Sequence, residues 1–249
     1  MTDSRKRLLL ICFKKSPASA EWLPAARFFP GARGKLDETK KVALSDQGRQ
    51  LGCSQVKHRP WRSPLAMEKI ATSIQGAWAL KPRVARDTRG YFFESWNQRS
   101  FREAGLDANF VQDNYSHSSK HVLRGLHYQA GDAAQGKLVW VTAGRVFDVI
   151  VDLRRTSPTF GRWHGCILGA EAHESLWIPP GCAHGFLVLS DYCDFQYKAT
   201  NLYSPEAERT LRWNDPHLAI EWPLGTGAEP IVSPRDAAGA SFAECEKFD

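Results

Sequence analysis

Residues 67–249 of this 249-residue chain predict an all-β fold, a sandwich or barrel with a few short helices. Three observations support this. Short runs of alternating or continuous apolar residues recur along the segment, clusters of Gly, Pro, Asn and Asp separate them, and only two stretches look helical. Regularly spaced runs of this kind are typical of antiparallel sandwiches and barrels. A segment of this size with many aromatic residues can bury a substantial core.

The runs predict strands at 77–80, 91–96, 137–142, 146–153, 176–179, 185–189, 195–200 and 209–213, and helices at 97–104 and 237–247. In the run from Val146 to Asp152, two acidic residues share a strand face with two branched apolar residues. This pattern indicates a partly solvated sheet face, or one that a partner covers. Because sandwich edges need covering, we expect a dimer.

Residues 1–66 differ in composition and show no period of 2 or 3.6. They hold 14 of the 33 Lys and Arg residues but 5 of the 27 Asp and Glu residues, so they carry a net +9 and residues 67–249 a net −3. We interpret 1–66 as a disordered basic extension or a start codon assigned too far upstream of Met67. Since the folded part is mildly acidic, no nucleic-acid partner is expected.

Targeting and redox signals indicate a cytoplasmic protein without a membrane span. The apolar run from Leu8 to Phe13 is shorter than the roughly 7 to 15 residues of a signal-peptide core and the roughly 20 of a membrane helix. The cysteines have no paired spacing and are expected to be reduced packing residues. They are Cys12, Cys53, Cys166, Cys182, Cys193 and Cys245. Cys182, two residues before His184, is a weak candidate nucleophile.

Chemistry concentrates between Val122 and Val141, where Arg124, His127 and Lys137 interrupt apolar, strand-like sequence. On a regular strand Arg124 and His127 face opposite sides, so they share a cavity only if the backbone bends at Gly125. Lys137 follows a Gly/Ala-rich turn and is expected to return on the adjacent strand. A base, a cation and an anion-binding Arg would then converge in one cavity. Burying an unpaired cation in an apolar strand is costly, so Arg124 and Lys137 are expected to have a binding role.

A metal site is a less well supported interpretation of His127 and His184. Small barrels of the cupin type usually bind metal through a His-x-His pair, a Glu and a later His, because residues two apart on a strand face the same side. His184 fits the later His, but Gln129 stands where the second His would be and no Glu follows. No metal is therefore expected, although a metal-dependent cupin oxygenase or isomerase stays open as an alternative.

The order of several segments resembles a known family. They are DTRGYFFES, FVQDNYSHS, VLRGLHYQ, AQGKLVWV, VFDVIVDLR, SPTFGRW, WIPPGCAHGF, YKATNLYSPEAE and WNDP. In this order and spacing, residues 67–249 resemble the dTDP-4-dehydrorhamnose 3,5-epimerases, and 1–66 have no counterpart. The resemblance implies a cupin-type jelly roll and a homodimer with no cofactor. It also implies epimerisation at carbons 3 and 5 of dTDP-4-keto-6-deoxy-D-glucose through an enolate, giving dTDP-4-keto-L-rhamnose for lipopolysaccharide and O-antigen sugars.

By the same resemblance, His127 is the base, Asp236 orients it, Tyr197 is the acid on the opposite face and Lys137 stabilises the enolate oxygen. An imidazole titrates near about 6.5 and a phenol near about 10, so each group suits its task. The residues implied in substrate binding are Arg89, Glu94, Gln112, Asp113, Asn114, Arg124, His184, Glu208 and Arg235, with Tyr203 stacking on thymine.

Two departures leave selectivity open: position 235 is Arg where relatives often have Lys, and Trp140 lies beside the face that carries Lys137. A mono-epimerase acting at carbon 3 or 5 of a related keto sugar therefore remains an alternative, as does a sugar-nucleotide binding module without catalysis.

Overall fold

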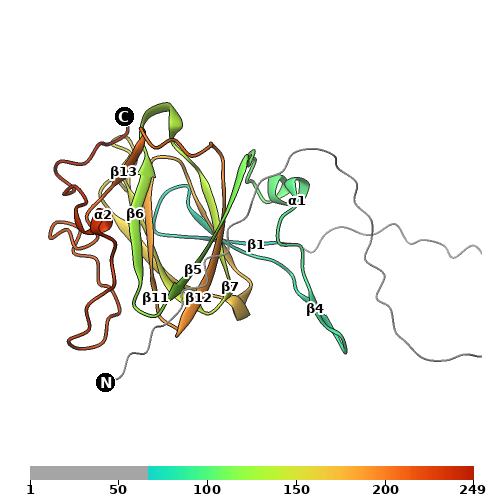
Figure 1. Cartoon of the computed structure of the whole chain (residues 1–249). Coiled ribbons are helices and arrows are strands. Elements are labelled where there is room, and N and C mark those ends of the chain that lie inside the picture. Colours follow the sequence, from blue (N-terminus) through green and yellow to red (C-terminus); the bar gives the residue numbers. More distant parts are fainter. Residues whose placement is uncertain (1–66) are drawn as a thin grey trace, which may run out of the picture. The chain divides into compact units, whose positions relative to one another are not determined.

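The computed structural model describes residues 67–249 and confirms the all-β prediction. The expectations for residues 1–66, including Cys12 and Cys53, lie outside the described residues. Two antiparallel sheets face each other, and a separate two-stranded hairpin projects away from them (Figure 1).

The six-stranded sheet has the order β1-β2-β10-β7-β12-β5. Its strands are β1 (Glu68–Ala71), β2 (Trp78–Lys81), β10 (Ser175–Ile178), β7 (Lys137–Ala143), β12 (Tyr192–Ala199) and β5 (Gln112–Ser119). The five-stranded sheet has the order β13-β6-β11-β8-β9. Its strands are β13 (Glu208–Thr210), β6 (Leu123–Gln129), β11 (Cys182–Val188), β8 (Arg145–Asp152) and β9 (Trp163–Gly169). The hairpin pairs β3 (Ala85–Asp87) with β4 (Gly90–Phe92). Two 3₁₀ turns, η1 (Gly131–Ala133) and η2 (Ala170–Ala172), complete the connections.

Most strands coincide with the predicted runs, and the differences are local. The run at 91–96 is a strand only in β4, and the run at 209–213 only in β13. The apolar pattern missed β1, β3, β5 and β9. The sequence of β5, QDNYSHSS, has no apolar alternation, because side chains on one of its faces line a pocket and those on the other are exposed.

The main core lies between the two sheets. Val139, Ile150, Leu176 and Phe195 are at most 1% exposed and belong to one apolar cluster. A second cluster packs the C-terminal segment onto the outer side of the five-stranded sheet. Its members include Leu126, Val149, Val151, Leu211, Leu218 and Phe242.

Strand β8 is therefore covered on both faces, and the predicted solvated face is wrong. Asp148 and Asp152 are both fully buried. Buried carboxylates need partners, and both have them: Asp148 pairs with His184, and Asp152 accepts hydrogen bonds from Arg154, Ser157 and Thr159. The six-stranded sheet covers the face that carries Val146 and Ile150, so the chain itself provides the cover that was assigned to a partner, and the C-terminal segment covers the opposite face.

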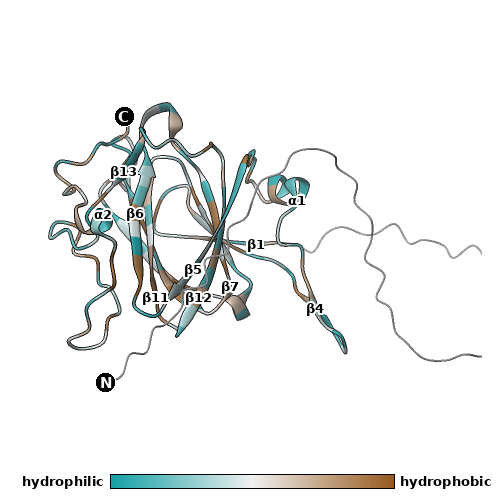
Figure 2. Cartoon of the chain, viewed as in Figure 1, coloured by the Kyte–Doolittle hydropathy of each residue, from teal (hydrophilic) through white to brown (hydrophobic). Residues whose placement is uncertain are grey.

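One of the two predicted helices is present. Helix α1 (Gln98–Glu103) begins after Asn97, whose side chain accepts N–H bonds of its first turn. It is mostly hydrophilic and buries only Phe101 (Figure 2). No described helix is long and apolar enough to cross a membrane.

The second helix was placed wrongly. Instead of 237–247, the C-terminal part contains the short helix α2 (Pro234–Ala237), capped by Ser233. The chain then leaves the helix because Ala240 pairs with the strand end: its N–H donates to Thr210 O at 2.9 Å, and its carbonyl accepts from Arg212 N at 2.8 Å.

Candidate active site

A pocket of about 260 Å³ lies between the two sheets. Eight of the predicted site residues line it: Asn114, Arg124, His127, Lys137, His184, Tyr197, Tyr203 and Glu208. They come from strands β5, β6, β7, β11, β12 and β13 and from the loop before β13. The pocket therefore depends on the long-range pairing of both sheets.

The expected bend at Gly125 brings Arg124 and His127 to the same pocket. His127 lies opposite His184, but Arg124 lies opposite Phe186, so β6 has one residue more than β11 in between. This bulge restores a common facing for two residues that are three apart. Gly125 has a φ of 127°, and a Cβ there would lie 2.6 Å from Gly185 Cα. Only glycine fits that approach.

His127 forms a dyad with Asp236. Its Nε2–H donates to Asp236 Oδ1 at 2.7 Å, while the backbone N–H of Gly125 donates to Asp236 Oδ2 at 3.3 Å. Burial raises the pKa of Asp236, but the hydrogen bonds from His127 and Gly125 outweigh it, and the pKa lies below its usual value. The carboxylate thus stays charged and places the proton of neutral His127 on Nε2. Nδ1 keeps its lone pair to accept a proton.

The cap of α2 positions this carboxylate. Ser233 Oγ accepts the backbone N–H of Asp236 at 3.1 Å, and Pro234 occupies the first helical turn, where its missing N–H costs nothing. Asp236 itself is 4% exposed. The dyad is therefore built from two segments that are 109 residues apart in the sequence.

Lys137 reaches the pocket from the other sheet. We predicted that it returns on a strand adjacent to His127, which is wrong: β7 belongs to the six-stranded sheet, and β6 to the five-stranded one. The Nζ donates to the His127 carbonyl at 3.3 Å and lies 5.9 Å from the centre of the Tyr197 ring. Burial lowers the pKa of Lys137 to about 8, although Glu208 and Asp148 raise it.

Because the ammonium of Lys137 is buried, we expect it to lower the free energy of unfolding. Lys137→Met should raise the free energy of unfolding by about 3 kcal/mol at pH 7, because the folded protein disfavours the ammonium and the unfolded chain does not. The gain should be full below about pH 8 and vanish above about pH 10.5, where wild-type lysine is neutral in both states. Urea unfolding across this pH range measures it. Lys81→Met, at a half-exposed lysine, is the control and should change stability by less than about 0.5 kcal/mol. A loss of stability in K137M at pH 7 would contradict the interpretation.

Tyr197 on β12 carries a proton at neutral pH. Burial raises its pKa above the usual value, and the negative charge of Glu208 adds to this effect, while Arg124 opposes it. A phenol that holds its proton can donate it to a carbanion. Phe186 and Phe195, which also line the pocket, stack at 4.2 Å between ring centres and form an apolar part of its wall.

A second histidine, His184, completes the buried wall. Its Nε2 lies 2.9 Å from Asp148 Oδ2, and the residue is 7% exposed. Cys182 is close in sequence, but burial raises the pKa of its thiol to about 12. The thiolate needed for nucleophilic attack is therefore absent at neutral pH, and the candidate nucleophile is not supported.

A polar network lies at the pocket mouth. Tyr203 Oη donates to Glu208 Oε2 at 2.5 Å, and Arg235 forms an ion pair with the same oxygen at 2.6 Å. Burial raises the pKa of Glu208, but these two donors outweigh it and the pKa lies below its usual value. Gln112 is close by and donates to Asn114 Oδ1 at 2.9 Å.

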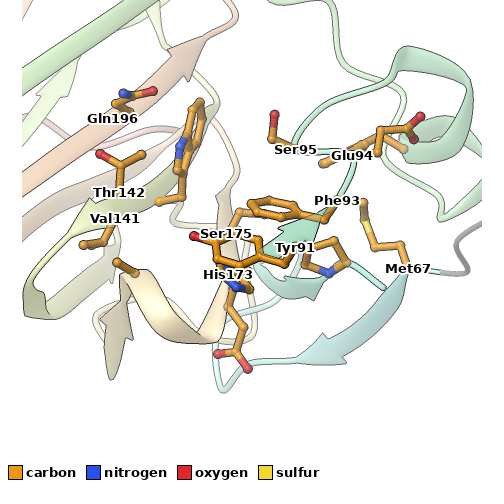
Figure 3. Close-up of a pocket in the computed structure, with 15 residues that line it drawn as sticks. Met67, Tyr91, Phe93, Glu94, Ser95, Val141, Thr142, His173, Ser175 and Gln196 are labelled. Carbon is orange, nitrogen blue, oxygen red and sulfur yellow. The ribbon is translucent and has the colours of Figure 1, made fainter. Parts of the chain in front are cut away.

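Three predicted binding residues lie elsewhere in this single chain. Arg89 is in the β3–β4 hairpin, where it pairs with Asp87. Glu94 accepts from Ser100 and Asn97 and lines a separate pocket of about 300 Å³. Figure 3 shows this second pocket, which is lined by Tyr91, Phe93, Glu94 and His173 among others. The side chain of Asp113 is 70% exposed and pairs with Lys198, because its neighbours Gln112 and Asn114 occupy the inward positions of β5.

Sequence reasoning missed several residues of the candidate site. Ser116, Gln129, Gln135, Phe186 and Phe195 also line the pocket. Ser116 could have been found from its spacing of two from Asn114. Within residues 67–249, no group of three or more His, Cys, Asp and Glu side chains is arranged to hold a metal ion.

Comparisons with known proteins show the family of this chain. A family model described as dTDP-4-dehydrorhamnose 3,5-epimerase matches residues 71–244. The chain is 53% identical over 183 residues to the dTDP-4-dehydrorhamnose 3,5-epimerase of Pseudomonas aeruginosa, and the match covers 73% of this chain and 99% of that protein.

Solved structures match as well. The Legionella pneumophila dTDP-6-deoxy-D-glucose-3,5-epimerase, in complex with dTDP-4-keto-L-rhamnose, is 49% identical with a TM-score of 0.69, over 72% of this chain and 95% of that one. A 3′-monoepimerase from Streptomyces bikiniensis, in complex with dTDP-quinovose, is 35% identical with a TM-score of 0.65, over 70% and 87%. The predicted cupin-type jelly roll is confirmed. The chain belongs to the dTDP-4-dehydrorhamnose 3,5-epimerase family.

Proposed function

We propose that this chain is an isomerase that inverts carbons 3 and 5 of dTDP-4-keto-6-deoxy-D-glucose and yields dTDP-4-keto-L-rhamnose. Both carbons flank the ketone at carbon 4, so their protons are the acidic ones of the ring. The observation that carries the proposal is the His127–Asp236 dyad, which lies in one pocket with the protonated Tyr197 and the buried Lys137. A base, an acid and a cation are what two successive enolisations require.

Each residue acts at a stated atom. His127 Nδ1 takes a ring proton while Asp236 stabilises the imidazolium that forms. The electrons of the broken C–H bond move into the ketone, and the ammonium of Lys137 stabilises the resulting negative charge on the oxygen. Tyr197 Oη then returns a proton from the opposite face of the ring. His127 then releases its proton to solvent and Tyr197 regains one from solvent, and with both groups restored the same steps at the second carbon complete the reaction.

The nucleotide is proposed to bind at the pocket mouth. Arg124 and Arg235 suit the diphosphate, because a guanidinium makes paired hydrogen bonds to phosphate oxygens. Tyr203, which is 52% exposed, offers its ring to the thymine. When the diphosphate arrives, Arg235 can exchange its ion pair with Glu208 for one with phosphate. Gln112, Asn114 and His184 are proposed to contact the sugar or nucleotide from the pocket walls.

We propose a homodimer in which Arg89 and Glu94 serve the site of a second copy. Both were implied in substrate contact, yet neither lies in the pocket of its own chain. The hairpin that carries Arg89 projects from the sheets (Figure 1) and exposes Tyr91 and Phe92 at 57% and 64%. A second copy of this chain would cover these apolar side chains.

Mixing two inactive variants tests the shared site. Arg89→Ala and His127→Asn should each be nearly inactive alone. A mixed dimer keeps one intact site, so an equimolar mixture allowed to exchange subunits should recover about a quarter of wild-type activity. Sedimentation checks the dimer. No recovery despite subunit exchange, or full activity of R89A alone, would contradict a shared site.

The overall reaction can be tested with the purified chain. Incubation with dTDP-4-keto-6-deoxy-D-glucose, followed by NMR of the sugar ring, should give the doubly inverted product. Turnover should persist after dialysis against a chelator, because the proposed steps use side chains alone. Loss of turnover that a divalent metal restores would instead favour the metal-dependent cupin alternative.

A further inference from the structure

The loop between β12 and β13 presents Tyr203 at the pocket mouth, and two glutamines hold it. We infer that Gln129 is a positioning residue for nucleobase binding: with Gln112 it clamps residues 202–204, so that the Tyr203 ring is fixed before the nucleotide arrives. This inference rests on the proposed function, in which Tyr203 stacks on the base.

Gln129 makes three hydrogen bonds to main-chain atoms. Its Nε2 donates to Ala133 O at 2.7 Å and to Leu202 O at 3.1 Å, and its Oε1 accepts the N–H of Ser204 at 2.8 Å. The residue is 4% exposed. Both amide hydrogens and one oxygen lone pair are thus used, and they tie the loop that contains Tyr203 to the turn after β6.

Gln112 holds the same loop from the opposite sheet. Its Oε1 accepts the N–H of Tyr203 at 2.8 Å. The N–H groups of two consecutive residues, Tyr203 and Ser204, therefore donate to glutamines from different sheets. These bonds hold the two peptide groups on either side of the Tyr203 Cα, so the backbone under the Tyr203 ring has little freedom to rotate.

The amide of Gln129 cannot be exchanged for a similar group. A glutamate has the same shape and could still accept from Ser204, but its second oxygen would face the carbonyls of Ala133 and Leu202 without a hydrogen to share. Buried, unmade hydrogen bonds of this kind cost about 1 to 3 kcal/mol each. Gln129 stands at the position where metal-binding cupins carry a second histidine, and here its amide bonds the loop at Leu202 and Ser204 and the turn at Ala133.

Holding the loop should strengthen nucleotide binding. Leu202 and Tyr203 are 67% and 52% exposed, so packing does little to order them. A loop that must be ordered on binding weakens affinity, and a fixed platform avoids that cost. The two glutamines bond the loop that carries the base-binding Tyr203 and make no hydrogen bond to Arg124 or Arg235, so base binding should depend on them more than diphosphate binding does.

The test compares ligands with and without a base. Glu in place of Gln129 (Q129E) should raise the Kd of dTDP about tenfold and leave the Kd of inorganic pyrophosphate within about twofold, by calorimetry. It should raise KM more than it lowers kcat. In a Tyr203→Ala background the same change should not weaken dTDP binding further, since the clamp acts through Tyr203.

Asn201→Asp is the matched control. Asn201 Nδ2 donates to Ala134 O at 2.8 Å and to Asp132 O at 3.2 Å, so this change also removes side-chain bonds between the two loops, but none to residues 202–204. It should leave the Kd of dTDP within about twofold. If N201D weakens dTDP binding as much as Q129E, or if the effects of Q129E and Y203A add, loosening of the loops in general is the cause and the inference fails.

Hydrogen exchange tests the clamp in the wild-type protein, so this test does not depend on whether a variant folds. Hydrogen exchange of the Tyr203 and Ser204 amides should be slow without ligand, because both N–H groups are bonded. Exchange at the rate of a free loop would overturn the clamp. If wild-type protein neither binds dTDP nor turns over the keto sugar, the proposed function fails. If it does both and Q129E binds dTDP equally well, only the clamp fails.

Discussion

Replacing His127 with Asn is expected to lower kcat by about 10³-fold or more, because a general base contributes roughly 10² to 10⁴ and this one serves both carbons. Asn keeps a polar side chain in the pocket but cannot accept the ring proton. Arg124, Arg235 and Tyr203 are unchanged, so the Kd of dTDP should stay within about threefold of wild type.

Steady-state kinetics and calorimetry of H127N measure the two effects separately. His217→Asn is the matched control, because His217 is exposed and stacks on Phe242 outside the pocket. It should retain wild-type turnover. A non-catalytic binding module would show no change of function in H127N, and turnover above about a tenth of wild type would exclude His127 as the base.

Replacing Asp236 with Asn should lower kcat nearly as much as H127N does, because it changes which ring nitrogen of His127 carries the proton. The two oxygens of Asp236 accept from His127 Nε2 and from the Gly125 N–H. Asn has a single oxygen. If that oxygen serves Gly125, the amide nitrogen faces His127 Nε2, which must then act as acceptor, and the proton moves to Nδ1. The lone pair that points into the pocket is lost, and a reduction of kcat by about 10³-fold or more is expected.

The tautomer can be measured directly. Nitrogen NMR of the His127 ring should show the proton on Nε2 in wild type and on Nδ1 in D236N. Ser233→Ala removes one hydrogen bond to the Asp236 backbone but keeps the carboxylate, so its loss of activity should be far smaller. Unchanged turnover in D236N, or the same tautomer in both proteins, would contradict the orienting role.

Much of the fold could be predicted because its buried strands are apolar and regularly punctuated. Strand β5 could not be predicted in this way. Its inward residues are polar because they line the pocket, so its sequence has no apolar alternation. The end of the chain was misread for another reason: the pattern at 237–247 indicated a helix, but Ala240 pairs with the strand end that follows β13. Tertiary pairing of that kind has no local signal.

The candidate site was predictable where residues are close in sequence or share a motif. The bend at Gly125 was anticipated from face alternation between Arg124 and His127. The sheet that carries Lys137 was not, since a ten-residue separation fits a return to either sheet. Gln129 was noticed only as a missing metal ligand, because its bonds to Leu202 and Ser204 span more than 70 residues.

The number of carbons inverted is the central claim, because members of this fold include a 3′-monoepimerase. Incubation of the chain with dTDP-4-keto-6-deoxy-D-glucose in heavy water, followed by NMR, reports each carbon separately. The account predicts that the wild-type protein places deuterium at both carbon 3 and carbon 5, and that H127N places deuterium at neither carbon. Deuterium at only one carbon would contradict the double epimerisation, and deuterium at neither would contradict proton transfer in this pocket altogether.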